Sequence, residues 1–350
     1  MSIATAIQNA QQKVADAYTA LSSKGGTLPQ TQDLSNLPTA INSIPSGGKK
    51  YNITIDDILG NIDENGAYHE PATQADIIFT GLKSFADEYC MMYEFARHPD
   101  IRTVSFPDLE DVNKRECLEA AFLGCSNLTS VSFPKLTTVS AYSGMKEMLA
   151  LTSITSLNLG LVTDIEDNGL NSVCNNCSTL TSINFDSLQN VSSQGMYYAF
   201  RFCNITEARF PSLVNIYSQG FQVVLADNVN LTSVSLPALK KVAYRGLNSA
   251  FSNTALTSMT FPSLDTIDAR ECFYYCFYNC PSLTSVSFPA LKSTSFGTYT
   301  NQFSSMLPGV TGCTVHFPSN LQSVIGSWAD VTAGFGGTNT TVLFDLPATE

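Results

Sequence analysis

The sequence predicts an α/β solenoid of about ten coils, each of roughly 26 residues, preceded by an N-terminal α-helical segment. A ten-residue phrase occurs twice almost unchanged, as NLTSVSFPKL at 127–136 and SLTSVSFPAL at 282–291. Its aromatic residue belongs to a series of equivalent apolar positions spaced 25 to 29 residues apart. A period of this length indicates stacked units that cannot bury their apolar faces alone. These anchors are Phe79, Phe106, Phe133, Leu159, Phe185, Phe210, Leu236, Phe261, Phe288 and Phe317.

Residues 1–44 form the first of four expected domains, a helical segment for oligomerisation or docking. Its apolar residues recur with heptad spacing, which is typical of a coiled-coil seam. A helix of about three heptads is marginally stable alone, so the seam needs a partner. That partner is either the rest of the same chain or another subunit, in a homo-oligomer such as a trimer or in a larger assembly. The seam residues are Ile3, Ile7, Val14 and Leu21.

Residues 45–78 are expected to be a linker and a neck that caps the solenoid. PSGG at 45–48 is typical of a flexible joint, and YNITI at 51–55 alternates as a strand does. The acidic residues at 56, 57, 63 and 64 lack the alternating pattern of a calcium loop, so they predict no metal site.

The solenoid is expected to span residues 79–325, with each anchor as position 0 of its coil. Leu or Ile at −5 and an apolar residue at −2 predict a short strand whose −5, −2 and 0 side chains point inward. A second extended piece leads to Val or Ile at +6. AFLGC at 121–125 and AFRFC at 199–203 favour a helix of one to two turns that closes each coil. Residues 326–350, with Trp328 and the strand TVLF, are expected to cap the last coil.

The recurring pattern AF-x-x-C-x-x-LTSV-x-FP-x-L resembles the leucine-rich repeat of the BspA and Treponema type. The resemblance covers about 240 residues and implies a leucine-rich-repeat solenoid. The coils anchored at Leu159 and Phe185 depart from it because they lack the proline. Separately, KGGTLPQTQDLSNLPTAINSIPSGG at 24–48 resembles a segment near the start of tail and fibre proteins of phages and prophages of Gram-positive bacteria.

The composition and apolar pattern of the chain argue against binding to nucleic acid and against insertion into a membrane. The chain has 18 basic and 30 acidic residues, and a net charge of −12 opposes binding to nucleic acid. Its first residues lack the basic and apolar regions of a signal peptide, and no stretch has the run of apolar residues of a membrane span, so we expect neither Sec export nor membrane insertion.

The ten cysteines follow the repeat. Cys125, Cys177 and Cys280 lie eight residues before their anchors, and Cys203 lies seven before its own. Such positions favour buried free thiols, because a buried cysteine behaves as a small apolar residue. Cys174 and Cys177 form a CxxC, but no second CxxC or nearby histidine accompanies it, so no zinc or redox site is predicted.

Catalysis is not expected. The three histidines, His69, His98 and His316, lie too far apart along a rigid stack to share a site, and no P-loop, GxSxG or HExxH motif occurs. The sequence therefore predicts no enzyme, no cofactor and no metal.

Ligand binding is predicted at position +9, which is polar or aromatic in successive coils, and at the tyrosines beside it. Arginine, glutamine and tyrosine together offer hydrogen-bond donors, acceptors and flat aromatic faces, a combination that suits polyhydroxylated or anionic polymers. The alternative is that +9 is a solvated turn position. The candidates are Arg115, Tyr142, Gln194, Tyr197, Gln219, Tyr244, Arg245, Arg270 and Tyr274.

The two resemblances lead to one functional hypothesis and two alternatives. The hypothesis is a non-enzymatic receptor-binding or tail-fibre protein of a phage or prophage virion, assembled in the bacterial cytoplasm. Its N-terminus would contact other tail proteins, and its solenoid would attach to a host cell-surface glycan or protein. The first alternative is a BspA-like adhesin of the bacterial cell surface. The second is a structural or decoration component of the virion with no ligand.

Overall fold

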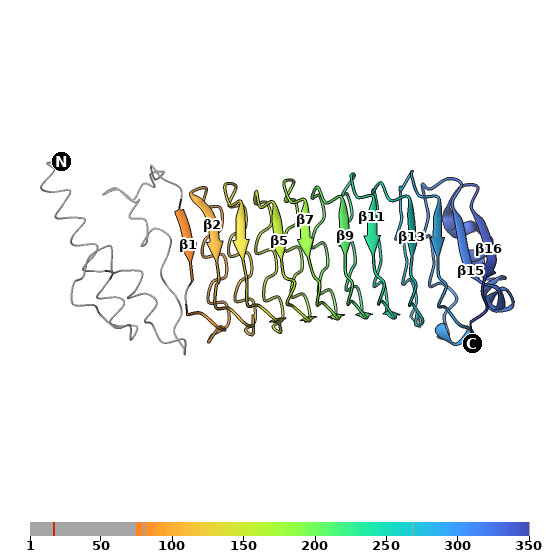
Figure 1. Cartoon of the computed structure of the whole chain (residues 1–350), viewed down its shortest axis with the longest axis horizontal. Coiled ribbons are helices and arrows are strands. Elements are labelled where there is room, and N and C mark those ends of the chain that lie inside the picture. Colours follow the sequence, from red (N-terminus) through yellow and green to blue (C-terminus); the bar gives the residue numbers. More distant parts are fainter. Residues whose placement is uncertain (1–16, 18–74, 80, 268, 350) are drawn as a thin grey trace, which may run out of the picture.

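The computed structural model describes Ala17 and residues 75–79, 81–267 and 269–349. Figure 1 shows the chain from residue 75 onward as an elongated stack of coils, whose strands lie side by side along the long axis. The seam residues Ile3, Ile7, Val14 and Leu21, and nearly all of the expected neck, lie outside the described residues. Within the described ranges, no helix combines the length and apolar character that a membrane crossing requires.

Short parallel strands form one face, termed the first ladder. In β3 the middle residue, Val131, is buried, while Ser130 and Ser132 are exposed. Equivalent positions pair between coils, as Met259 of β13 does with Val286 of β14. The predicted strand before each anchor is therefore confirmed. The strands are β1 (Ala75–Ile78), β2 (Ile101–Ser105), β3 (Ser130–Ser132), β5 (Ser156–Asn158), β7 (Ser182–Asn184), β9 (Glu207–Arg209), β11 (Ser233–Ser235), β13 (Ser258–Thr260), β14 (Ser285–Ser287), β15 (Thr314–Pro318) and β16 (Thr341–Leu346).

A second ladder of two-residue strands follows the five anchors from Phe133 to Leu236. Its strands pair in parallel, each with the next coil's, in one sheet of five. The residue at +6 is buried in each strand, as Val191 is in β8. The predicted second extended piece is therefore confirmed. The strands are β4 (Thr138–Val139), β6 (Asp164–Ile165), β8 (Asn190–Val191), β10 (Asn215–Ile216) and β12 (Lys241–Val242).

The remaining side of each coil is a run of turns, termed the turn segment, where the sequence predicted a helix. Alternate backbone N–H groups donate to the next coil, as Tyr89 does to the Arg115 carbonyl at 3.0 Å. The intervening groups donate three residues back, as Met92 does to Tyr89 at 3.3 Å. An α-helix would need every N–H to bond four residues back within its own segment. The α/β prediction is wrong in this respect: the described residues form a β-solenoid with few helices.

Every fourth residue of the turn segment has a left-handed backbone. In the coil that starts at Gln194, the φ angles of Gln194, Tyr198 and Phe202 are 55°, 56° and 56°. This conformation costs an L-residue about 1 to 2 kcal/mol, and the hydrogen bonds to the next coil offset it. The third left-handed position is held by Asn or Asp in four coils, which are the side chains that tolerate it best: Asn176, Asp227, Asn253 and Asn279.

The residue directly after the first left-handed position of a turn segment is small, because side chains of the second ladder pack against its backbone. A Cβ added to Gly195 would lie 2.8 Å from Val191 Cγ1, and one added to Gly246 would lie 2.9 Å from Val242 Cγ1. Five successive coils place glycine there: Gly144, Gly169, Gly195, Gly220 and Gly246. The other coils place a cysteine at the equivalent position: Cys90, Cys117 and Cys272.

The anchors stack on one another in the core. The rings of Phe106 and Phe133 lie 5.2 Å apart and within 8° of parallel, and those of Phe261 and Phe288 lie 5.3 Å apart and within 5°. All of these rings are nearly or fully buried. Burial of this aromatic column, with the stacking between its rings, holds successive coils together.

All ten cysteines are buried free thiols. Those near the end of the turn segment hydrogen bond to a carbonyl of the preceding coil, as Cys125 Sγ does to Phe95 O at 3.0 Å and Cys280 Sγ to Phe251 O at 3.1 Å. Thr254 and Asn228 fill the same slot in other coils and also donate to buried carbonyls. Burial raises the pKa of Cys174, the first cysteine of the CxxC. No group of three metal-ligating side chains gathers within the described residues.

The C-terminal end closes the stack. Trp328 lies edge-on to Phe296 with ring centroids 5.0 Å apart, and Phe344 of β16 stacks on Phe317 at 5.8 Å. Trp328, Phe296 and Phe344 are partly buried and pack against the core. The short helices of this region are η1 (Ser293–Ser295), η2 (Ser319–Leu321), α4 (Gln322–Ile325), α5 (Ala329–Thr332) and η3 (Gly334–Gly336).

Candidate functional site

The candidate residues lie where the turn segment follows the second ladder, but position +9 is not a single row. Gln194, Gln219 and Arg245 are the first left-handed residues of their coils. Arg115, Tyr142 and Arg270 each stand one residue earlier, before the left-handed Glu116, Ser143 and Glu271. The stretch from anchor to turn segment is one residue longer in those three coils, which counting from the anchor could not reveal. Tyr244 lies in the earlier row, and Tyr197 and Tyr274 lie three residues past the left-handed position.

Arg115 and Tyr142 form the first group on this border. The Arg115 guanidinium lies 5.2 Å from the Tyr142 ring centroid and 5.9 Å from that of Tyr89 in the preceding coil. Its Nε also lies 3.0 Å from Glu116 Oε1, and that hydrogen bond is the main reason why the pKa of Arg115 is raised. The sequence prediction missed Tyr89 and Glu116 because they occupy other positions relative to their anchors.

Gln194 and Gln219 form the second group. Gln194 Nε2 donates to Gln219 Oε1 at 3.1 Å, and Gln219 Nε2 donates to Gln222 Oε1 at 2.7 Å. Beside them the rings of Tyr197 and Tyr198 meet edge to face, with centroids 4.2 Å apart. Burial and a hydrogen bond to Tyr198 raise the pKa of Tyr197 to about 12, so its hydroxyl stays protonated near neutral pH.

The third group gathers two arginines and two tyrosines from adjacent coils. The Arg245 guanidinium lies 5.3 Å from the Tyr244 ring and 5.7 Å from the Tyr274 ring, and Arg270 lies 5.1 Å from Tyr244. Glu271 Oε2 holds Arg245 Nε at 2.6 Å. This is the densest clustering of the predicted residues, and cation–π contacts fix the ring faces.

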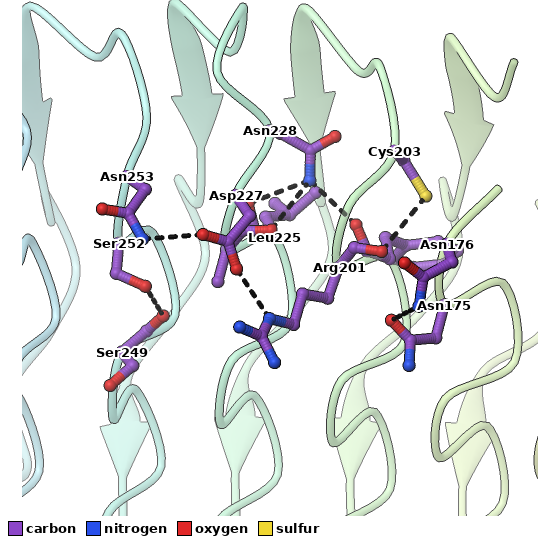
Figure 2. Close-up of polar contacts among 12 residues, drawn as sticks. Asn175, Asn176, Arg201, Cys203, Leu225, Asp227, Asn228, Ser249, Ser252 and Asn253 are labelled. Carbon is purple, nitrogen blue, oxygen red and sulfur yellow. Dashed lines mark hydrogen bonds and ion pairs between the residues drawn. The ribbon is translucent and has the colours of Figure 1, made fainter. Parts of the chain in front are cut away.

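Figure 2 shows a polar clamp farther along the turn segments, at the third left-handed position. Asp227 accepts from Arg201 Nε at 2.6 Å and from Asn253 Nδ2 at 2.7 Å, so three coils meet at one carboxylate. The next residue in the chain, Asn228, is fully buried. It donates to the Phe200 carbonyl at 2.8 Å and accepts from the Ile205 N–H at 3.0 Å. The sequence prediction did not include these residues, although Asn or Asp recurring just before the cysteine slot signals them. The clamp joins three successive coils.

The three groups offer guanidinium and amide donors, amide acceptors and aromatic faces. Of the predicted histidines, His316 lies on β15 with Nδ1 3.0 Å from Asp345 Oδ1.

Comparison with known families settles the class of the repeat. A family model described as "BspA type Leucine rich repeat region (6 copies)" matches residues 90–226, 171–276 and 224–329. The chain belongs to this family. The predicted leucine-rich-repeat class of the solenoid is thereby confirmed.

Two solved structures are similar at low identity. The crystal structure of the pneumococcal vaccine antigen PcpA is 14% identical, covers 81% of this chain and 82% of that chain, and has a TM-score of 0.28. A leucine rich cell surface protein from Faecalibacterium prausnitzii A2-165 is 11% identical, covers 79% of this chain and 89% of that chain, and has a TM-score of 0.19. The comparison with curated proteins gave no match.

Proposed function

We propose that this chain is a non-enzymatic adhesion protein of the BspA type, which binds a cell-surface ligand along the border of its turn segments. Membership of the BspA-type family supports the surface-adhesin alternative more than the virion hypothesis. The observation that carries the binding surface is the cluster of Tyr244, Arg245, Arg270 and Tyr274, where two guanidinium groups lie over ring faces on one edge of the stack.

The virion hypothesis rests on the resemblance of residues 24–48 to phage tail and fibre proteins. That segment lies outside the described residues, and the family match begins at residue 90. The hypothesis therefore stays a prediction.

The test changes Gln194, Gln219, Arg245 and Arg270 together to alanine in the full chain. We expect attachment to isolated bacterial cell walls or to cultured epithelial cells to weaken, while the chain still folds, because these side chains are exposed or half-buried and none belongs to the apolar core. The matched control changes Ser130, Ser156, Ser233 and Ser285 of the first ladder to alanine. If the first variant attaches fully and the control does not, the ligand binds the first ladder instead of the border. If both variants attach as the parent does, neither surface binds the ligand, and a structural role for the protein is favoured.

A further inference from the structure

Coils alternate in the length of the connector between the turn segment and the first ladder. Counting from the third left-handed residue, the next strand starts six residues later in one set of coils, as from Gly124 to Ser130 and from Asn176 to Ser182. In the alternate coils it starts five residues later, as from Phe202 to Glu207 and from Asn253 to Ser258. The short connectors are TSIT at 152–155, CNIT at 203–206, TALT at 254–257 and VTGC at 310–313.

Three of these four short connectors coincide with a break in the first ladder. Among the described strands, β5 pairs with β7 and β9 pairs with β11, but no pairing joins β3 to β5, β7 to β9 or β11 to β13. Each break lies directly before the strand that follows a short connector. The fourth short connector leads to β15, which pairs with β14.

The break between β7 and β9 opens a surface hollow of about 350 Å³. Its lining includes Ser182, Asn184 and Asp186 from one coil and Thr206, Glu207 and Arg209 from the next. This volume is near the lower end of small-molecule sites.

Charge distinguishes this break from the other two. Arg209 Nε donates to Glu207 Oε1 at 2.7 Å, and the side chains of Arg209 and Glu207 are 70% and 48% exposed. The equivalent outward residues of the strands after the other two breaks are Ser156 and Asn158 in β5, and Ser258 and Thr260 in β13, and none of these side chains carries a charge.

We propose that this hollow is a carbohydrate-binding subsite that takes one or two sugar residues. Glu207 and Asp186 supply acceptors for sugar hydroxyls, Arg209 and Asn184 supply donors, and the hydroxyls of Ser182 and Thr206 do both. The hollow contains two carboxylates, of Asp186 and Glu207, and one guanidinium, of Arg209, so its net negative charge disfavours a phosphate ligand. The proposal goes beyond the proposed adhesion surface, because the hollow lies on the first ladder and shares no residue with the turn-segment border.

The test uses the full chain and saturation-transfer NMR with glucose, galactose and N-acetylglucosamine. We expect at least one sugar to bind, and the E207A/R209A variant to weaken that binding at least tenfold. The control variant S258A/T260A, at the matched break, should bind as the parent does. A third variant, Ser182→Tyr, should fill the hollow and abolish binding without a change in the melting temperature.

Three outcomes would overturn the subsite: none of the three sugars binds, E207A/R209A and Ser182→Tyr bind as the parent does, or the matched control loses binding equally. Because attachment through the turn-segment border is measured with other variants, its failure and the failure of this subsite are distinguishable.

Discussion

Arg201 and Asp227 join two adjacent coils through an ion pair in which Nε lies 2.6 Å from Oδ2. Asp227 has a left-handed backbone with φ of 62°, so its side chain both tolerates the turn and ties it to the neighbouring coils. Asn253, the equivalent residue of the next coil, extends the same chain of contacts by donating to Asp227 and accepting from Asn279.

Asp227→Ala should destabilise the solenoid by about 2 kcal/mol, because it loses two hydrogen bonds and places alanine in a left-handed conformation. Asp227→Asn should cost less, since asparagine occupies this position in three other coils. Urea unfolding followed by circular dichroism measures both. Equal losses for the two variants would contradict the role given to the left-handed backbone.

Asn228→Leu should destabilise by about 3 kcal/mol, because it leaves the buried Ile205 N–H and Phe200 carbonyl without their partner. Asn228→Cys should lose less, since Cys125, Cys177 and Cys280 donate from the same slot in other coils. The urea midpoints of the leucine and cysteine variants test this prediction. A leucine variant as stable as the parent would mean that the slot needs only an apolar filling.

Gly195→Val should destabilise by about 2 kcal/mol or more, because even the Cβ would lie 2.8 Å from Val191 Cγ1 and the core would be overpacked. Gly312→Ala is a useful contrast on space alone, since an added Cβ there meets no atom within 4 Å, although its φ of 71° adds backbone strain. Thermal unfolding of the two variants should show the larger loss for Gly195→Val. The reverse order would refute the steric argument.

The thiols should resist alkylation in the folded protein at pH 8. Burial raises the pKa of Cys90, Cys125 and Cys313 to about 11, so little reactive thiolate forms. Iodoacetamide followed by mass spectrometry should label none of the ten cysteines in the native chain and all ten after denaturation without reductant. Protected pairs after denaturation would indicate disulfides.

These raised pKa values make stability depend on alkaline pH. The folded pKa values of Cys90, Cys125 and Cys313 lie above the ordinary value of a cysteine thiol, so these three residues release their protons first in the unfolded chain as pH rises. The thiol contribution to stability is therefore complete below about pH 9 and falls between about pH 9 and pH 11. Melting temperatures at pH 8 and pH 10.5 test this, and replacing Cys90 and Cys313 with Ala should reduce the difference.

Residues 1–44 should control assembly. Ile7→Asp with Val14→Asp puts charge into the heptad seam, which would disfavour any packed seam. Light scattering should show an oligomer for the full chain, and a monomer for both the double variant and the 51–350 fragment. Identical masses per chain in all three samples would mean that the seam packs within its own subunit.

The sequence sufficed for the strands because their signals are repeated and local. Val131 and Phe133 alternate with outward serines, and the same alternation recurs in every coil, so chance patterns average out. The turn segment was mispredicted because residues such as Ala199, Phe200 and Cys203 have the apolar spacing of a helix. Hydrogen bonds to the next coil overrule that local preference, and no single coil encodes them.

The candidate border was predicted in part. Counting from the anchors found Arg245 and Arg270, but it could not find Glu271, whose contact with Arg245 depends on how far one coil is set from the next. The hollow between β7 and β9 lies at a break that follows a short connector, and the length of that connector becomes visible only once the left-handed positions fix the register.

The hydrogen bonds that join one turn segment to the next all run in one direction. In most coils from residue 89 onward, five N–H groups point to carbonyls of the following coil, as Tyr93 does to Glu119 and Ser143 does to Asp167. Their peptide dipoles therefore add along the long axis, as they do in a helix, but with the opposite polarity. The positive pole lies at the C-terminal end of the stack and the negative pole at its first coil, so the solenoid is an electrically polarised rod whose two ends favour ions of opposite sign.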